Sequence, residues 1–96
     1  MLVLVSYDVS TRTKEGKRRL RRVARLCEDR GQRVQNSVFE CLVDASQWVA
    51  FRAAIIAEAA VDEDSLRFYF LGNKWKGRVE HVGTKPTYDP EGPLIL

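Results

Sequence analysis

The spacing of apolar side chains changes repeatedly along this chain, and the order of the changes limits the fold more than any other feature. Short segments in which apolar residues alternate or run together are typical of strands, and longer segments that repeat them every three or four residues are typical of helices. The sequence predicts, in order, strand 2–7, helix 14–30, strand 33–35, strand 38–43, helix 45–59 and strand 66–71.

Elements in this order, joined by right-handed crossovers, form an α+β fold: a four-stranded antiparallel sheet with both helices on one face, the ferredoxin-like arrangement. The break at Asn36-Ser37 predicts a hairpin, although one long strand with a bulge there also fits. Residues 78–82 alternate like a further strand, which we expect at an edge and which could add to a partner's sheet. We therefore expect a ferredoxin-like domain with a C-terminal edge strand at residues 1–82 and a C-terminal tail at residues 83–96.

Local signals mark the ends of both helices. Thr13 is a candidate N-cap for the first helix, and Gly31 is expected to end it as a C′ residue. The core stripe of this helix is predicted to be Leu20, Val23, Ala24 and Cys27. Asp44 followed by Gln47 resembles a capping box at the start of the second helix, whose apolar residues are Trp48, Phe51, Ile55 and Ala59.

Length and cysteine content exclude several classes of protein. Ninety-six residues provide one domain with a single two-layer core. Cys27 and Cys41 form no C-x-x-C pair and His81 is the single histidine, so we expect no structural zinc site within one chain and a reduced setting. The opening apolar run meets Asp8 too soon for a signal peptide or a membrane span. These observations predict a soluble cytoplasmic protein without a membrane partner.

The face of the sheet that no helix covers needs a partner. We expect this face to carry Val3, Val5, Tyr7, Tyr69 and Leu71, which would form a large exposed apolar patch in a monomer. The sequence therefore predicts a homodimer that packs sheet against sheet.

Positive charge is concentrated on the first helix. Ten of the sixteen Lys and Arg residues lie between Arg12 and Arg33. The candidate nucleic-acid-binding residues on the side opposite the core stripe are Lys14, Arg18, Arg21, Arg22 and Arg25. Such a run is often a solvated surface. Three acids among ten bases are too few to neutralise it by pairing, however, so contact with DNA or RNA is the favoured interpretation.

Four segments resemble the CRISPR-associated protein 2 family, over roughly residues 1 to 82. Val5–Val9 is similar to its strand-terminal Y-D-hydrophobic motif, and Lys17–Val23 is similar to its basic helix. Gly31–Glu40, read G-Q-R-V-Q-N-S-V-F-E, resembles its long G-x-R-V-Q-x-S-V-F-E signature, and Leu66–Leu71 resembles its fourth strand. The long signature is the most specific of the four.

The resemblance implies a ferredoxin-like homodimer of the prokaryotic adaptive immune system that acts with the CRISPR integrase in spacer acquisition. Family members are also described as Mg²⁺-dependent endonucleases on single-stranded RNA or double-stranded DNA. Asp8 could simply cap the loop that follows it, but the resemblance favours a metal-binding, catalytic role for this residue. Arg33, or Arg22, would then steady charge that develops on a phosphate.

Two functions therefore remain open, a nucleic-acid-binding scaffold and a metal-dependent endonuclease. One carboxylate per chain is too few for a two-metal nuclease, although two Asp8 side chains near a dimer axis could share one Mg²⁺. No general base is evident, since His81 lies in the later strand, so hydrolysis is expected to be slow. Trp75, between two lysines, could anchor a partner or stack on a base.

Overall fold

The computed structural model describes residues 1–71 and 79–83, so Trp75 and the tail beyond Gly83 lie outside the described residues. The elements, in chain order, are β1 (Leu2–Asp8), α1 (Lys14–Glu28), β2 (Gly31–Gln35), β3 (Val38–Leu42), α2 (Ala45–Glu58), β4 (Ser65–Leu71) and β5 (Val79–Gly83). Their order confirms the predicted succession of strands and helices.

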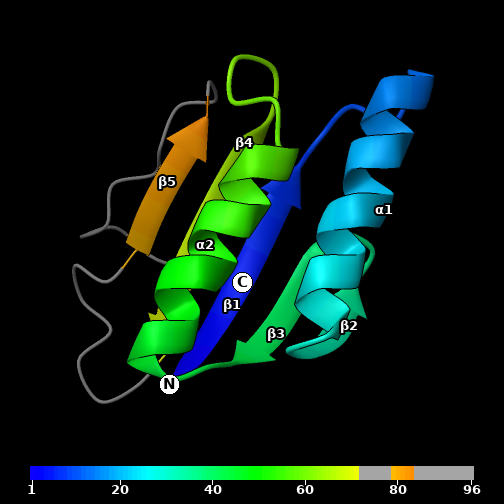
Figure 1. Cartoon of the computed structure of the whole chain (residues 1–96). Helices are drawn as coiled ribbons and strands as arrows, with labels where there is room; N and C mark the ends of the chain where they lie inside the picture. Colours follow the sequence, from blue (N-terminus) through cyan, green and yellow to red (C-terminus); the bar gives the residue numbers. More distant parts are fainter. Residues whose placement is uncertain (72–78, 84–96) are drawn as a thin grey trace.

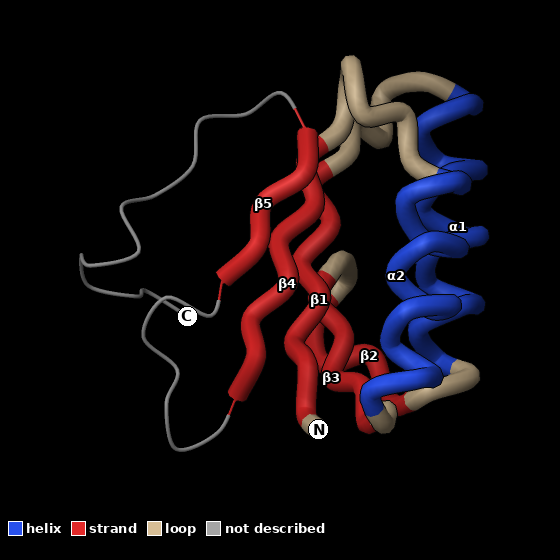
Figure 2. Tube along the Cα trace, turned by 60° about the vertical axis from the view of Figure 1, so that its left-hand side comes forward, coloured by secondary structure: helices blue, strands red, loops and turns tan. Residues whose placement is uncertain are grey.

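The five strands form one antiparallel sheet in the order β2-β3-β1-β4-β5. Both helices lie on the same face of this sheet (Figure 1), and Figure 2 shows the sheet edge-on with α1 and α2 on one side. This is the expected ferredoxin-like arrangement with an extra edge strand. The edge strand β5 pairs with β4 of its own chain, with Leu66 opposite Val82. Arg52 of α2 and Glu80 of β5 tie the two elements together, with N–O distances of 2.8 and 2.5 Å.

The N-terminus of α1 is capped as expected, whereas the expected glycine at its C-terminus has another role. Thr13 is the N-cap, and its hydroxyl accepts a hydrogen bond from the Gly16 backbone at 3.0 Å. The expectation that Gly31 ends the helix in a left-handed conformation is wrong, because Gly83 has the one positive φ among the described glycines. Gly31 instead begins β2, where a Cβ would overlap the carbonyl oxygen of Glu40 on β3. Close approach of two backbones therefore requires glycine at this position.

The hairpin predicted around Asn36-Ser37 is present, and the single long strand left as its alternative is not, because β2 and β3 are separate antiparallel strands. Strand β2 pairs with β3 through Arg33 opposite Phe39 and Gln35 opposite Val38, with a register shift between these pairs. On α2, both halves of the predicted capping box form, at 2.7 and 2.9 Å. Trp48 then packs edge-on against Phe51, Phe68 and Phe70.

The orientation of β1 differs from the expectation. Val3, Val5 and Tyr7 are completely buried in the core beneath the helices, so the prediction that they lie on the open face is wrong. Alternation in the sequence separates two sets of side chains, but both sets of this strand begin with aliphatic residues, and nothing local says which set the helices cover. Tyr69 and Leu71 do lie on the open face, opposite Leu4 and Leu2.

The open face is divided into two parts, because side chains of directly paired residues share a face. The apolar half of the open face consists of Leu2, Leu4, Leu42, Tyr69, Leu71 and Val79, with one charged residue, Glu40, opposite Leu4. The acid end, where β1 finishes and β4 begins, carries Asp8, Ser65, Arg67 and His81. Apolar side chains therefore predominate at one end of this face and polar side chains at the other.

Candidate functional site

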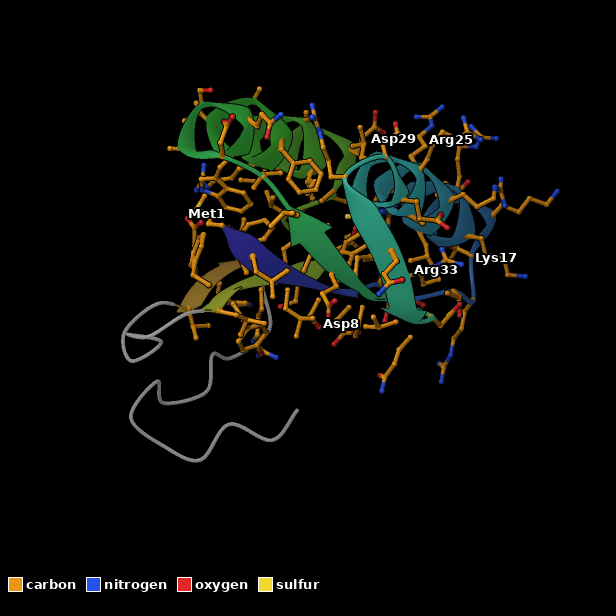
Figure 3. The ribbon with its side chains drawn as sticks, turned by 90° about the horizontal axis from the view of Figure 1, so that it is seen from below. Met1, Asp8, Lys17, Arg25, Asp29 and Arg33 are labelled. Carbon is orange, nitrogen blue, oxygen red and sulfur yellow. The ribbon has the colours of Figure 1, made fainter. Side chains whose placement is uncertain are left out.

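Asp8 lies at the exposed last position of β1, directly opposite Ser65 of β4. Figure 3 shows it on the side of the sheet away from the helices. Among residues 1–71 and 79–83, no group of three or more His, Cys, Asp or Glu side chains is placed to hold a metal ion. The role of Asp8 as a metal ligand therefore stays a prediction, with one exposed carboxylate from each chain.

Next to Asp8, the fold contains a buried polar network that the sequence did not reveal. Asp64 is 1% exposed and accepts hydrogen bonds from the Tyr7 hydroxyl and, at 3.1 Å, from the Ala60 backbone N–H. Arg19 approaches the same carboxylate as a fork, at 2.8 and 3.0 Å. A core-facing tyrosine needs a partner for its hydroxyl, but the sequence cannot say that this partner lies 57 residues away.

Electrostatics within the network favour a charged Asp64. Burial would raise the pKa of Asp64, but hydrogen bonds from Arg19, Tyr7 and the Ala60 N–H outweigh it and hold the pKa below its usual range. Burial and the Asp64 carboxylate raise the pKa of Tyr7, which therefore stays a neutral donor. The network joins β1, α1 and the start of β4, and so fixes the strand ends that carry Asp8 and Ser65.

On the open face, the structure brings the single histidine to the acid end. Ser65 Oγ and His81 Nε2 are 2.5 Å apart, and His81 lies directly opposite Arg67. The sequence placed His81 in a separate edge strand and therefore supplied no general base for Asp8. Pairing of β5 with β4, which local patterning cannot specify, is what moves the imidazole to this end of the sheet.

Arg33, the second predicted catalytic residue, is not brought to Asp8 within one chain. It lies opposite Phe39, whose side chain is completely buried on the helix-covered face. The Arg33 guanidinium lies over the Phe39 ring, 5.3 Å from the centroid. Asp8 and Arg33 therefore occupy opposite faces of the sheet.

The predicted basic residues of α1 form one exposed surface, which we call the α1 basic surface. Its members are Lys14, Arg18, Arg21, Arg22 and Arg25, all of them exposed. Among the ion pairs between described residues, Arg22 is the member with an acidic partner, Glu58 at 3.6 Å. Arg19, from the same run, turns inward to Asp64. Side chains of this helix spread outward in Figure 3, away from Asp8.

No helix in the described part of the chain is long and apolar enough to cross a membrane.

The family described as CRISPR associated protein Cas2 matches residues 1–79. The protein named CRISPR-associated endoribonuclease Cas2 of Chlorobaculum tepidum is 60% identical over the whole of both chains. The CRISPR-associated endonuclease Cas2 of Halalkalibacterium halodurans is 52% identical, again over both whole chains. The crystal structure of Streptococcus pyogenes Cas2 is 52% identical and superposes with a TM-score of 0.74, covering 86% of this chain and all of that one. The resemblance seen in the sequence is thus confirmed, and the chain belongs to the CRISPR-associated Cas2 family.

Proposed function

We propose that the chain is a CRISPR adaptation protein, a homodimeric nucleic-acid-binding scaffold that partners the CRISPR integrase in spacer acquisition in the cytoplasm. The observation that carries this proposal is the α1 basic surface, which presents several cations in a row with Glu58 as the one acidic partner among the described residues. Such a surface neutralises phosphates without reading bases. It suits a protein that must hold DNA of any sequence.

The proposed homodimer rests on the apolar half of the open face. Leu42 is 68% exposed there, and Leu2 and Leu4 lie beside it on the neighbouring strand. No helix of the described residues covers this face (Figure 2). A second copy packed across a two-fold axis would bury the same patch on both chains. Light scattering tests this directly, with a dimer mass expected at micromolar concentration and a mass near 11 kDa contradicting it.

Nucleic-acid binding is tested by changing Arg18 and Arg21 together to Ala. Affinity for duplex DNA should fall irrespective of sequence, and the log-log slope of affinity against salt should flatten by about 0.9 for each lost phosphate contact. A matched control places Glu at the exposed positions Ala50 and Ala57 of α2, because it lowers the net charge by the same amount. If both variants weaken binding equally, general charge rather than the α1 basic surface attracts DNA.

A second function, an endonuclease, is favoured by the names of the relatives, and we propose that it depends on Mg²⁺. The donor set fits such an ion in part, since Mg²⁺ is commonly held by one or two carboxylates and otherwise by water. Asp8 of each protomer would hold it. The bound ion would polarise a phosphoryl oxygen at the acid end. Arg33 stays a predicted catalytic residue, and its position over Phe39 means that it would have to act from another molecule in the assembly.

Labelled single-stranded RNA and duplex DNA, incubated with Mg²⁺ or EDTA, test the endonuclease. Asp8→Ala should abolish EDTA-sensitive cleavage and leave the dimer intact. The scaffold should tolerate this change, because the arginines of α1 neutralise the phosphates. Loss of spacer acquisition in cells with Asp8→Ala, at normal protein level and integrase binding, would contradict the scaffold and favour the nuclease.

A further inference from the structure

The acid end contains a hydrogen-bonded pair that the proposed functions leave without a role. Ser65 is 2% exposed, and its Oγ lies 2.5 Å from His81 Nε2. A half-buried imidazole fixed by a buried hydroxyl has a defined orientation, since its ring cannot turn without breaking this bond. The fold therefore fixes the orientation of His81, whereas a histidine free on the surface would rotate.

Strand register places this pair beside Asp8. Asp8 is directly opposite Ser65, and direct partners have Cβ atoms about 4.5–5.5 Å apart on the same face. Ser65 in turn faces Gly83, which has no side chain, and His81 lies two residues before it on β5. Because Gly83 has no side chain, the imidazole of His81 has room to reach Ser65 diagonally on the neighbouring strand. Carboxylate, hydroxyl and imidazole thus follow one another across three adjacent strands.

The arrangement leaves one imidazole nitrogen available. When Nε2–H donates to Ser65 Oγ, the lone pair of Nδ1 remains on the other side of the ring and can accept a proton. Burial and the nearby charge of Arg67 lower the pKa of His81, which favours the neutral ring at pH 7. Arg67 and Asp8 are the charged groups of the described strands on this face near His81, whereas Glu80 projects to the other face and pairs with Arg52.

We propose that His81 is the proton acceptor of the Asp8 site and that Ser65 is the positioning residue that holds its ring. The inference rests on the endonuclease function proposed above. Nδ1 takes a proton from a water molecule as the water oxygen bonds to phosphorus. The bond from phosphorus to the leaving oxygen breaks, and that oxygen takes a proton from solvent, to which the imidazolium later returns its own. The sum is the hydrolysis of one phosphodiester bond.

The first test needs no cleavage, because His81 is the one histidine of the chain and its NMR signals need no assignment by mutation. Nitrogen-15 chemical shifts of the ring report which nitrogen carries the proton, and their pH dependence reports the pKa. We expect the Nε2–H form and a pKa below that of a free histidine. A proton on Nδ1 of the neutral His81 ring would overturn the assignment, since that nitrogen could then not accept a proton from water.

The second test compares cleavage across pH in the full-length dimer with Mg²⁺ and the labelled RNA and DNA. For wild type, kcat/KM should rise with pH through the pKa measured by NMR. His81→Gln should lower kcat/KM on the order of 10²- to 10⁴-fold and remove this acidic limb. Ser65→Ala should cause a smaller loss and shift the limb together with the NMR pKa. Ser6→Ala, which removes another open-face hydroxyl of the strand that carries Asp8, is the matched control and should leave the profile unchanged.

The outcomes separate the two proposals. Cleavage that is lost in Asp8→Ala but keeps its acidic limb in His81→Gln overturns the role of His81 and leaves the endonuclease standing. Absence of Asp8-dependent cleavage in the wild type overturns both. Thermal melting and light scattering identify a variant that fails to fold or dimerise. If His81→Gln fails in this way, Ser65→Ala decides the role of His81: the acidic limb of its pH profile must shift together with the pKa measured by NMR, and a limb that does not follow this pKa overturns the role.

Discussion

Asp64, immediately before β4, and Asp8, the last residue of the neighbouring strand β1, are acids that serve opposite purposes. Asp64 is 1% exposed and bound by Tyr7, Arg19 and a backbone N–H, whereas Asp8 is exposed at the end of β1. One residue along β1 separates the two environments, because Tyr7, the partner of Asp64, points into the core and Asp8 points away from it. The comparison teaches that a charged residue beside a candidate site can serve to stabilise the fold alone and take no part in the chemistry. Perturbing each acid in turn should separate stability from chemistry.

The largest effect is expected for Asp64→Ala. Removing this carboxylate leaves the half-buried Arg19 and the buried Tyr7 hydroxyl without their shared partner, and breaking a buried pair in this way costs about 3–5 kcal/mol. Urea unfolding followed by circular dichroism measures the loss. Glu63→Ala is the matched control, because Glu63 is an exposed acid 3.8 Å from the same arginine and its removal should change stability little. Equal losses in the two variants would show that the network does not hold the strand ends.

Tyr7→Phe should have a smaller effect. This change keeps the ring in the core and removes the hydroxyl that donates to Asp64, a hydrogen bond to a charged group worth about 1.5–3 kcal/mol. The same unfolding experiment in an Asp64→Ala background completes a double-mutant cycle, in which the tyrosine change should cost much less. Additive losses would indicate that Tyr7 contributes packing alone.

Lowering the pH should weaken the Asp64 network in the wild-type protein and so lower its free energy of unfolding. Because the pKa of Asp64 is lower in the folded than in the unfolded chain, its stabilisation is complete above the unfolded pKa and is lost as pH falls through the folded pKa. The free energy of unfolding of wild type should therefore approach that of Asp64→Asn as the solution is acidified. Unfolding curves for both proteins at several pH values between neutral and strongly acidic give this comparison. A constant difference at every pH would contradict it.

Asp8→Asn should change stability least, by no more than about 1 kcal/mol if the carboxylate caps the following loop. Any cleavage that depends on Asp8 should nevertheless disappear. Unfolding and cleavage measured on the same preparation test both halves of this prediction. A loss comparable with that of Asp64→Ala would move Asp8 from the candidate site into the fold.

Local signals in the sequence predict most of the fold. The Thr13 cap, the capping box at Asp44 and the alternation from Leu66 each involve residues within a few positions of one another, and each is confirmed. The facing of β1 could not be predicted in this way, because Leu2 and Leu4 are as apolar as the Val3 and Val5 that enter the core. Which set is buried depends on where the helices pack.

The candidate site is predicted less completely, for a related reason. Asp8 and the exposed arginines of α1 stand out by charge and position along the chain. Asp64 and His81 do not, since their partners are 45 residues away at Arg19 and 16 residues away at Ser65. A buried acid in an acidic turn has the same local sequence as a solvated one. Only the assembled sheet distinguishes them.

The position of β5 at the edge of the sheet has a consequence for when the acid end exists at all. Among the described strands, β5 pairs with β4 alone, and Arg52–Glu80 is its ion pair to the helical layer. Edge elements held by so few bonds open by local unfolding at a lower free energy than the core. Amide hydrogens of β5 should thus exchange faster than those of β1, and each opening would withdraw His81 from Ser65 while the rest of the protein stays folded.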